Sequence, residues 1–255
     1  DLRQPLHALN LLVGLLDEER DPARREQIGG RISRAVSNIN ELFDGLLDIS
    51  KLDAGVVAPQ WADVPLAPLL QRVHARFVDD AQAKGLKLLL APTRVWVRTD
   101  PQLMERIVQN LVGNAVRYTH SGGVVLGCRR SNGAVRIEVW DSGVGIPGDK
   151  QQQIYAEFYQ IASQRSLRSE GLGLGLAIVD RLCGLLGHRI DLRSAPDVGT
   201  RFALTVPRVE PQPAPALPEP VRQDGEPLRG RKVLVIDDDE LVLQGAGGLL
   251  ASWGC

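Results

Sequence analysis

Three short segments in the middle of the chain combine glycine with amide and carboxylate side chains. They read N-L-V-G-N-A-V-R-Y-T (110–119), D-S-G-V-G-I-P (141–147) and G-L-G-L-G-L-A-I-V (171–179). Together they supply the groups that a nucleoside triphosphate needs. These are an acceptor for the amino group of the base, amide oxygens for Mg²⁺ and backbone N–H groups for the phosphates. The ordered set predicts an ATP site, although no single segment would do so alone.

The acidic residue of the second segment is expected to bind the base. Asp141 ends a predicted strand, where its carboxylate can accept a hydrogen bond from the adenine amino group. Gly143 and Gly145 allow the backbone to turn tightly beneath the base. Taken alone, this segment is equally compatible with a surface turn. The amide-bearing segment upstream favours the nucleotide interpretation.

The first segment is predicted to lie on a helix that begins at residues 100–101, Asp-Pro. Asn110 and Asn114 are four residues apart, so both amides project from one helical face. Asparagine is a poor helix former, and two amide oxygens suit a Mg²⁺ ion that keeps water and phosphate ligands. Arg117 and Tyr118, on the next turn, would offer a cation and a hydroxyl group to the phosphates. A capped surface helix is the competing interpretation.

The third segment is predicted to bind phosphates through its backbone. Gly171, Gly173 and Gly175 are not followed by the Lys-Ser or Lys-Thr of a P-loop, and a Rossmann loop is disfavoured by their spacing. They instead open a helix, expected within residues 172–186, whose N–H groups and dipole would hold the β- and γ-phosphates. The polar residues 149–170 predict a mobile lid.

Two amphipathic helices are expected at the start of the chain. From residue 28 onward, apolar side chains recur at alternating steps of four and three, which indicates helix-on-helix packing, and a shorter stripe precedes them. Asp21-Pro22 lies between the stripes and can begin the second helix. One hairpin cannot bury both stripes, so we expect two copies to pair as a four-helix bundle in a homodimer. The stripe residues are Leu6, Leu9, Val13, Leu16, Ile28, Ile32, Ala35, Ile39, Leu42, Leu46 and Ile49.

The rest of the chain predicts a second folded domain followed by a linker. Residues 59–68 are interpreted as a connector, and the proline-rich residues 210–229 as an extended linker. Between them, helical and strand-like segments mix without regular alternation, which favours an α/β sandwich with helices on one face of a mixed sheet. The overall class is therefore α+β. The expected elements are a helix at 69–83, strand-like runs within 86–97, strands at 122–127 and 134–140 joined by a turn at 131–133, and a strand at 201–206.

Composition narrows the classes of protein. The 255 residues carry a net charge of −1, with 24% charged and 44% hydrophobic residues. These values are ordinary for a globular protein and argue against a broad basic surface for nucleic acid. No apolar run approaches the roughly 20 residues of a membrane span. Three scattered cysteines and four separated histidines indicate neither a disulfide framework nor a zinc site. We expect a cytoplasmic protein, or the cytoplasmic part of a longer membrane-bound sensor.

In this order, the three segments resemble the N, G1 and G2 boxes of the ATP-binding domain of bacterial sensor histidine kinases. This Bergerat-type domain is related to gyrase and heat-shock chaperones. The resemblance implies that Asn114 is the Mg²⁺ ligand and that Phe158 and Tyr159 belong to the aromatic box of the lid. It also implies that Gly199-Thr200 is the final nucleotide-contacting pair.

Both ends of the chain extend this resemblance. D-L-R-Q-P (1–5) matches the tail of the family's H-box, which implies a phosphate-accepting histidine just before Asp1 and a proton-accepting role for the Asp1 carboxylate. Gln4 stands where relatives that also act as phosphatases carry Thr or Asn, so phosphatase activity is an open question. Residues 232–236 are predicted to form a strand that leads into an acidic cluster, after which a helix begins. V-L-V-I-D-D-D-E (233–240) resembles the start of a receiver domain, in which Asp237 and Asp238 would bind Mg²⁺. A solvated acidic turn is the alternative.

These expectations describe the catalytic core of a hybrid sensor histidine kinase. It would comprise a dimerisation and phosphotransfer hairpin (1–58), an ATP-binding domain (59–209), a linker (210–229) and the start of a receiver domain (230–255). The γ-phosphate of ATP would pass to the histidine and then to an aspartate of the receiver domain or of a separate response regulator. The chain as given is expected to bind ATP without autophosphorylation. Two alternatives stay open, namely a gyrase-like or chaperone-like ATPase and a nucleotide-binding dimer scaffold without kinase activity.

Overall fold

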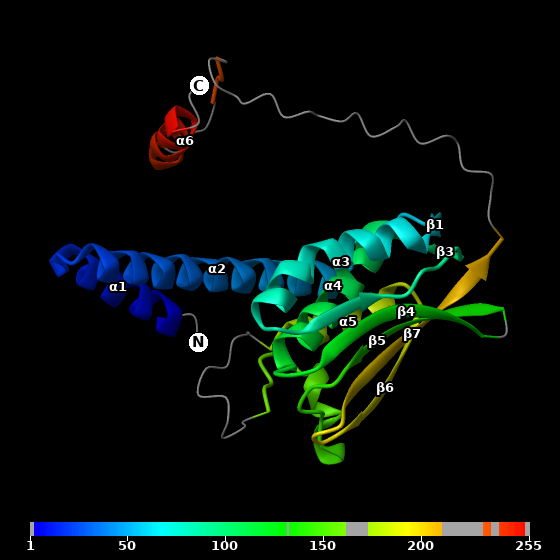
Figure 1. The fold of residues 1–255 in the computed structure, drawn as a ribbon. Helices are drawn as coiled ribbons and strands as arrows, with labels where there is room; N and C mark the ends of the chain where they lie inside the picture. The colour runs from blue at the N-terminus through cyan, green and yellow to red at the C-terminus, as the bar shows by residue number, and fades with distance from the viewer. Residues whose placement is uncertain (1–2, 132, 162–172, 211–231, 236–239, 253–255) are drawn as a thin grey trace. The chain divides into compact units, whose positions relative to one another are not determined.

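The computed structural model describes residues 3–131, 133–161, 173–210, 232–235 and 240–252. It separates into two units, residues 1–212 and 213–255. The first unit consists of a helical hairpin followed by a sheet that carries helices on one face (Figure 1). No helix among the described residues is long and apolar enough to cross a membrane.

The chain begins with a helical hairpin, as the apolar stripes predict. Helix α1 spans Arg3–Glu18 and helix α2 spans Pro22–Asp53. The Asp21 carboxylate accepts a hydrogen bond from the N–H of Ala23 at 3.0 Å, and Pro22 occupies the first helical turn, where its missing N–H has no cost. The predicted start of the second helix is therefore confirmed.

The second part of this unit is a seven-stranded mixed sheet. Its strands follow the order β1-β3-β7-β5-β4-β2, and β6 pairs with β7. All neighbours are antiparallel except β2 and β4, which run parallel. The strands are β1 (Ala62–Pro65), β2 (Lys87–Leu90), β3 (Trp96–Thr99), β4 (Gly123–Ser131), β5 (Ala134–Asp141), β6 (Arg189–Ala195) and β7 (Gly199–Val209).

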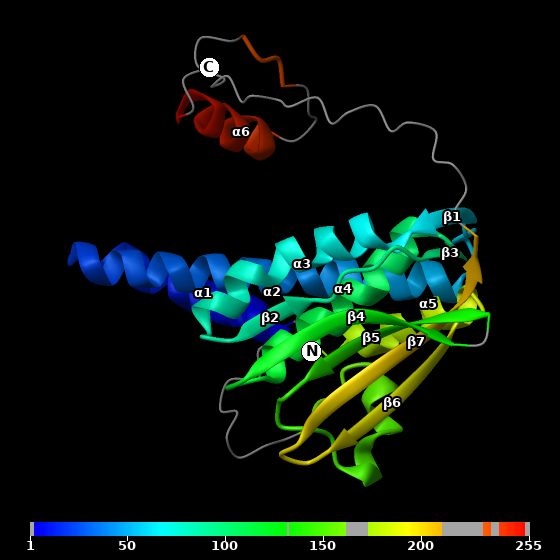
Figure 2. The same cartoon turned by 45° about the vertical axis from the view of Figure 1, so that its right-hand side comes forward.

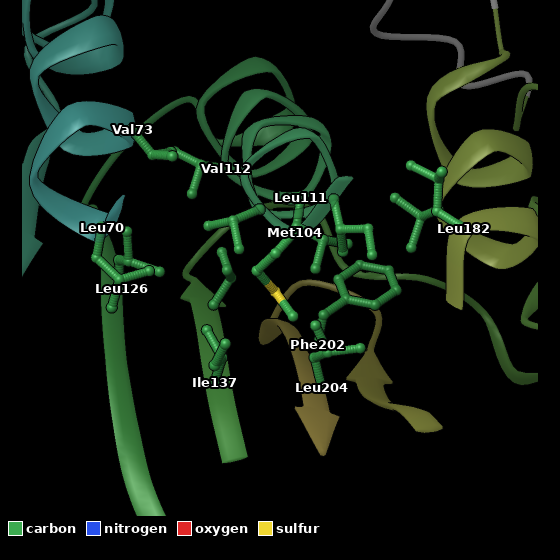
Figure 3. Packing of buried hydrophobic residues seen from close by; sticks show 14 of the residues in the cluster. Leu70, Val73, Met104, Leu111, Val112, Leu126, Ile137, Leu182, Phe202 and Leu204 are labelled. Carbon is green, nitrogen blue, oxygen red and sulfur yellow. The ribbon is translucent and has the colours of Figure 1, made fainter. Parts of the chain in front are cut away.

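Three helices cover one face of the sheet: α3 (Leu66–Ala83), α4 (Pro101–Tyr118) and α5 (Gly175–Leu185) (Figure 2). Met104 of α4 is fully buried and points toward the sheet, where Ile137 and Phe202 meet it (Figure 3). Burial of a side chain of this size stabilises the fold by about 1.5–3 kcal/mol. The core between α4 and the sheet therefore holds the helix that carries the two asparagines.

Several elements differ from the sequence prediction. The expected connector 59–68 contains strand β1 and the first residues of α3, and strand β6 was not predicted at all. Helix α5 begins at Gly175 and not at residue 172, because Gly173 has a positive φ of 70° that a helix does not accept. Strand β7 extends beyond the predicted 201–206 in both directions because it pairs with β3, β5 and β6.

In the second unit, a strand was expected from Lys232 to Ile236. Residues 232–235 form no strand, since no neighbouring strand accepts their backbone hydrogen bonds among the described residues. Helix α6 (Glu240–Ser252) follows, in agreement with the prediction that a helix begins after the acidic cluster. The cluster itself, with Asp237 and Asp238, lies outside the described residues.

His188 is a buried histidine between α5 and β6. Its side chain hydrogen-bonds through Nε2 to Oγ1 of Thr99 at 2.9 Å, and its ring meets the edge of Trp61 at a centroid distance of 6.2 Å. In the described part of the chain, Nδ1 has no hydrogen-bond partner. Burial disfavours the charged imidazolium and lowers the pKa of His188 to about 4.

Acid should therefore destabilise the fold through His188. Between the unfolded pKa of 6.5 and the folded pKa of about 4, the unfolded chain binds more protons. The free energy of unfolding should then fall by about 1.4 kcal/mol per pH unit as the pH drops through this window. His188→Gln should remove this slope, measured as urea unfolding at about pH 7.5 and about pH 5.5. Equal pH dependence in the two proteins would contradict a buried neutral histidine.

Candidate nucleotide-binding site

Helix α4 is anchored at its N-terminus by Asp100. Oδ1 of this carboxylate accepts hydrogen bonds from the N–H groups of Gln102 and Leu103 at 2.9 and 3.0 Å. Its Oδ2 accepts a third hydrogen bond, at 2.7 Å, from the N–H of Gln60. The segment that leaves the hairpin is thereby tied to the start of α4. The cap and the buried face of the helix together fix the direction in which its asparagines point.

The two asparagines border the first residue of helix α5. Asn110 donates from Nδ2 to the backbone oxygen of Arg106 at 2.9 Å, which leaves its Oδ1 as an acceptor. A Cβ placed on Gly175 would lie 2.9 Å from Asn110 Oδ1 and 3.7 Å from Asn114 Nδ2. The first and third glycine-containing segments therefore meet here, with amide groups next to the N-terminus of a helix. This environment favours a phosphate group together with its Mg²⁺ ion.

The carboxylate of Asp141 is held by two backbone groups. Its Oδ1 accepts from the N–H of Gly143 at 2.9 Å and from the N–H of Thr200 at 3.2 Å. Among the described residues, Oδ2 takes part in no further hydrogen bond, so it can accept one from a ligand. Burial raises the pKa of Asp141 because it disfavours the charge, and the two N–H groups offset part of this effect.

Glycine is required in the turn after Asp141 because other backbone segments approach it closely. A Cβ on Gly143 would lie 2.5 Å from the backbone oxygen of Tyr118 at the end of α4. Gly145 has a φ of +67°, and a Cβ there would lie 1.9 Å from the backbone oxygen of Ala195 in β6. The turn thus fits between the end of α4 and the β6–β7 hairpin, which brings the first two predicted segments together.

Sequence reasoning missed two side chains that hold this turn. Ser194 Oγ accepts from the N–H of Ile146 at 2.8 Å and lies 2.9 Å from both the backbone oxygen of Gly199 and Oγ1 of Thr200. Gln151 donates from Nε2 to the backbone oxygens of Ile146 and Ser194 at 3.1 and 3.0 Å. Neither residue carries a signal in the sequence, because a serine in a strand and a glutamine in a polar segment are both ordinary.

The aromatic pair within the expected lid, Phe158 and Tyr159, lies against the third glycine segment. The N–H of Phe158 donates to the backbone oxygen of Gly173 at 3.1 Å. A Cβ on Gly173 would lie 2.8 Å from the Phe158 carbonyl carbon and from the Tyr159 backbone oxygen. Phe158 has a φ of 58°, which is rare for a bulky residue and marks local strain. Residues 162–170 of the expected lid, and Gly171 after them, lie outside the described residues.

Helices α4 and α5 both form ion pairs with helix α2 of the hairpin. Arg181 of α5 donates from Nε to Oδ1 of Asp53 at 2.7 Å and from Nη2 to Oε1 of Glu157 at 2.5 Å. This guanidinium lowers the pKa of Asp53. Arg106 of α4 forms a second ion pair with Asp48 of α2. The ion pairs connect α2 with the two helices that border the candidate phosphate site, a connection that the sequence prediction did not include.

The structure places the predicted nucleotide-binding residues in two groups that both border α4. Asn110 and Asn114 border Gly175 at the start of α5, while Asp141, Gly143 and Gly145 lie in the turn next to the end of α4. The remaining described candidates differ in exposure: Thr200 is 7% exposed, Arg117 is half-buried and Tyr118 is 47% exposed at the end of α4. The candidates outside the described residues are Asp1, Gly171, Asp237, Asp238 and the side chain of Gln4.

An amide-bearing helix, a carboxylate in a glycine turn and a helix that opens at glycine define an ATPase domain of the histidine kinase and gyrase class. A family model described as "Histidine kinase-, DNA gyrase B-, and HSP90-like ATPase" matches residues 99–210. A second model, "His Kinase A (phospho-acceptor) domain", matches residues 1–55. The chain therefore contains the phospho-acceptor domain and the ATPase domain of a histidine kinase.

Named relatives agree with this assignment. The aerobic respiration control sensor protein ArcB of Escherichia coli strain K12 is 30% identical over 259 residues, which cover 100% of this chain and 33% of ArcB. The chain therefore spans about a third of the length of this curated relative. Full-length ShkA in complex with AMPPNP is 25% identical, with a TM-score of 0.63 over 97% of this chain and 51% of ShkA. Histidine kinase ThkA in complex with the response regulator protein TrrA shares the fold, with 19% identity and a TM-score of 0.65 over 82% of this chain and 59% of that chain.

Proposed function

We propose that this chain is the catalytic core of a hybrid sensor histidine kinase that binds Mg-ATP and transfers the γ-phosphate to a histidine. One observation carries the proposal. Asp141 is fixed by the N–H groups of Gly143 and Thr200 on one oxygen, which leaves the other oxygen to bind a base amino group. Full-length ShkA, which covers almost all of this chain in the comparison, was solved with the ATP analogue AMPPNP and supports the choice of nucleotide.

The adenine and the phosphates would occupy opposite ends of this region. Asp141 would accept from the adenine amino group, while the glycine segment before α5 would donate its backbone N–H groups to the phosphates. Asn114, with Asn110 beside it, would hold the Mg²⁺ ion, whose charge would neutralise that of the phosphate oxygens. Arg117 and Tyr118 are proposed to contact the phosphates, as the sequence prediction places them one turn further along α4.

The transfer itself would depend mainly on how the γ-phosphate and the accepting histidine are positioned, since phosphoryl transfer needs little covalent chemistry from the protein. The accepting histidine is proposed to lie immediately before Asp1, and Asp1 would help to take its proton. Gln4 would be placed to orient a water molecule if the protein also removes phosphate from its partner. Loss of phosphatase activity in Gln4→Ala, with the kinase activity intact, would support that role.

The hairpin is proposed to pair with a second copy. Six large apolar side chains of α1 and α2 are between 40% and 58% exposed, so one hairpin leaves much of its apolar surface in water. A four-helix bundle formed by two hairpins would bury such a surface. These side chains are Leu11, Val13, Leu15, Val36, Phe43 and Leu47.

The proposed next acceptor of the phosphate is an aspartate of a receiver domain. Residues 230–255 are proposed as the start of such a domain in cis, with Asp237 and Asp238 as Mg²⁺ ligands, and a separate response regulator is the second possible partner. The complex of ThkA with the response regulator TrrA supports this type of partner. We propose domain boundaries at residues 58, 209 and 229, and a cytoplasmic location for this core.

Removal of the Asn114 amide should weaken nucleotide binding only when magnesium is present. Titration calorimetry with ATP, with and without Mg²⁺, should show tight Mg-dependent binding to the unchanged chain. Asn114→Ala should lose about 10-fold to 100-fold of the affinity for Mg-ATP, because a ligand of the ion is lost. Asn40→Ala removes an exposed helical amide from α2 and should change nothing. Equal losses with and without Mg²⁺ would contradict a role in metal binding.

A second experiment separates the kinase from the two alternatives. A chain with a histidine placed before Asp1 is incubated with Mg-ATP, and acid-labile phosphate on the protein is measured. Phosphohistidine supports the kinase. Steady ATP hydrolysis without phosphohistidine supports a gyrase-like or chaperone-like ATPase instead. Absence of both phosphohistidine and ATP hydrolysis supports a dimer scaffold without kinase activity.

A further inference from the structure

We propose that Ser194 is a positioning residue that makes the site selective for a 6-aminopurine over a 6-oxopurine by fixing the direction of the Thr200 hydroxyl proton. The inference rests on the proposed nucleotide-binding function and adds a specificity-determining residue to it. It begins with Ser194, a half-buried residue of β6 for which the sequence predicted no role.

The direction of each hydrogen bond around Ser194 follows from counting protons. A serine hydroxyl has one proton to donate and can accept twice. The N–H of Ile146 can only donate, so Ser194 Oγ accepts at this 2.8 Å contact. The backbone oxygen of Gly199 can only accept, so the single Ser194 proton is committed to it at 2.9 Å. The remaining contact is with Oγ1 of Thr200 at 2.9 Å, and there the threonine must be the donor.

This assignment leaves the Thr200 hydroxyl oxygen as an acceptor toward the nucleotide site. Thr200 is next to the base-binding carboxylate, because its own N–H donates to Asp141 Oδ1 at 3.2 Å. The threonine is 7% exposed, so bulk water contributes little to the orientation of its hydroxyl. Both side chains at this end of the site then present acceptors, namely Asp141 Oδ2 and Thr200 Oγ1.

Two acceptors favour a ligand with a donor at this position. Adenine has a 6-amino group, which donates, whereas hypoxanthine and guanine have a 6-oxo group, which only accepts. A hydroxyl that is free to rotate could donate to the 6-oxo group and would reduce the discrimination. Because Ser194 holds the threonine proton, that rotation would break a buried hydrogen bond. Two residues therefore set the specificity. Asp141 supplies a charged acceptor for the 6-amino group, and Ser194 prevents the Thr200 hydroxyl from donating to a 6-oxo group.

Calorimetric dissociation constants for ADP and IDP, measured on the full chain, test this inference. The measured quantity is the ratio of the IDP constant to the ADP constant. Ser194→Ala should lower this ratio by about fivefold, the value of one neutral hydrogen bond. Ser194→Thr keeps a hydroxyl in a strand that tolerates β-branched residues, and it should restore most of the ratio. Thermal unfolding of each variant shows whether the fold is retained.

Gln151→Ala is the matched control. It removes two hydrogen bonds to the same turn, at the Ile146 and Ser194 carbonyls, but changes no hydroxyl proton. We expect it to weaken ADP and IDP binding by the same factor and to leave the ratio unchanged. A lower ratio in Gln151→Ala as well would mean that the general rigidity of the turn sets the selectivity, and this would overturn the role of Ser194.

The remaining outcomes separate this inference from the proposed function. If Ser194→Ala does not fold, Thr200→Val replaces it, because loss of the Thr200 acceptor should also lower the ratio. An unchanged ratio in the variant that folds would overturn the role of Ser194 and leave ATP binding intact. Failure of the unchanged chain to bind ADP would instead contradict the proposed function.

Discussion

Replacement of Asp141 by asparagine is expected to weaken ADP binding by about 100-fold. The asparagine oxygen can still accept from the N–H groups of Gly143 and Thr200. Its amide nitrogen would then face the adenine amino group, so that a charged hydrogen bond of about 1.5–3 kcal/mol is replaced by two opposing donors. A change of about 2.8 kcal/mol corresponds to 100-fold in affinity. Titration calorimetry measures it directly.

The same substitution should not destabilise the fold. The pKa of Asp141 is raised by burial, so the charged carboxylate opposes folding above that pKa and its removal relieves the opposition. We therefore expect a melting temperature that is unchanged or higher without nucleotide. Asp197→Asn is the matched control, because it removes an equal charge from an exposed turn at a φ of 57°, which asparagine tolerates. Normal ADP affinity in Asp141→Asn would remove the main observation behind the proposed function.

The second large effect is expected from Gly199→Ala. Gly199 has a φ of +118°, and a Cβ there would lie 2.0 Å from the backbone oxygen of Asp141. The strand β7 would have to move away from the end of β5, which would break the hydrogen bond from the Thr200 N–H to Asp141. Urea unfolding should show a loss of about 3 kcal/mol or more, in the range of substitutions that force a backbone shift. ADP binding should be lost with it.

Gly133→Ala separates the cost of a positive φ from the cost of a steric clash with the added Cβ. Gly133 also has a positive φ, of +78°, but nothing lies within 4 Å of a Cβ placed on it. This variant should lose only about 1 kcal/mol, the usual cost of an alanine in a left-handed conformation, and should bind ADP normally. Similar losses in the two variants would show that the contact with Asp141 contributes little.

Features that depend on local chemistry could be predicted from the sequence. Asp21-Pro22 and Asp100-Pro101 both begin helices, because a side-chain acceptor followed by a preset φ acts on the next turn without help from the rest of the fold. The spacing of Asn110 and Asn114 likewise predicts a shared helical face, and both amides border Gly175.

Features that depend on distant partners could not be predicted. Strand β6 alternates Arg189, Asp191 and Arg193 with Ile190, Leu192 and Ser194, a strand-like pattern that the sequence prediction overlooked, but its pairing with β7 depends on the fold. The role of Ser194 requires that Ile146 and Thr200 both lie near it, and this is known only after the fold is known. The ion pair of Arg181 with Asp53 joins residues 128 positions apart, and neither residue carries a local signal for the other.

Helix α2 carries a glycine, Gly45, at the point where Leu174 of the glycine segment contacts it. A Cβ on the buried Gly45 would lie 2.9 Å from Cδ1 of Leu174, and Leu174 directly follows Gly173. Rotation of α2 about its axis would bring a neighbouring side chain to this point, and Leu174 would have to withdraw. This contact would therefore couple any rotation of the helix to the conformation of the phosphate loop. A ligand that shifts the loop would change the equilibrium between orientations of the helix. By reciprocity, a rotation of the helix would change the affinity for that ligand by the same factor.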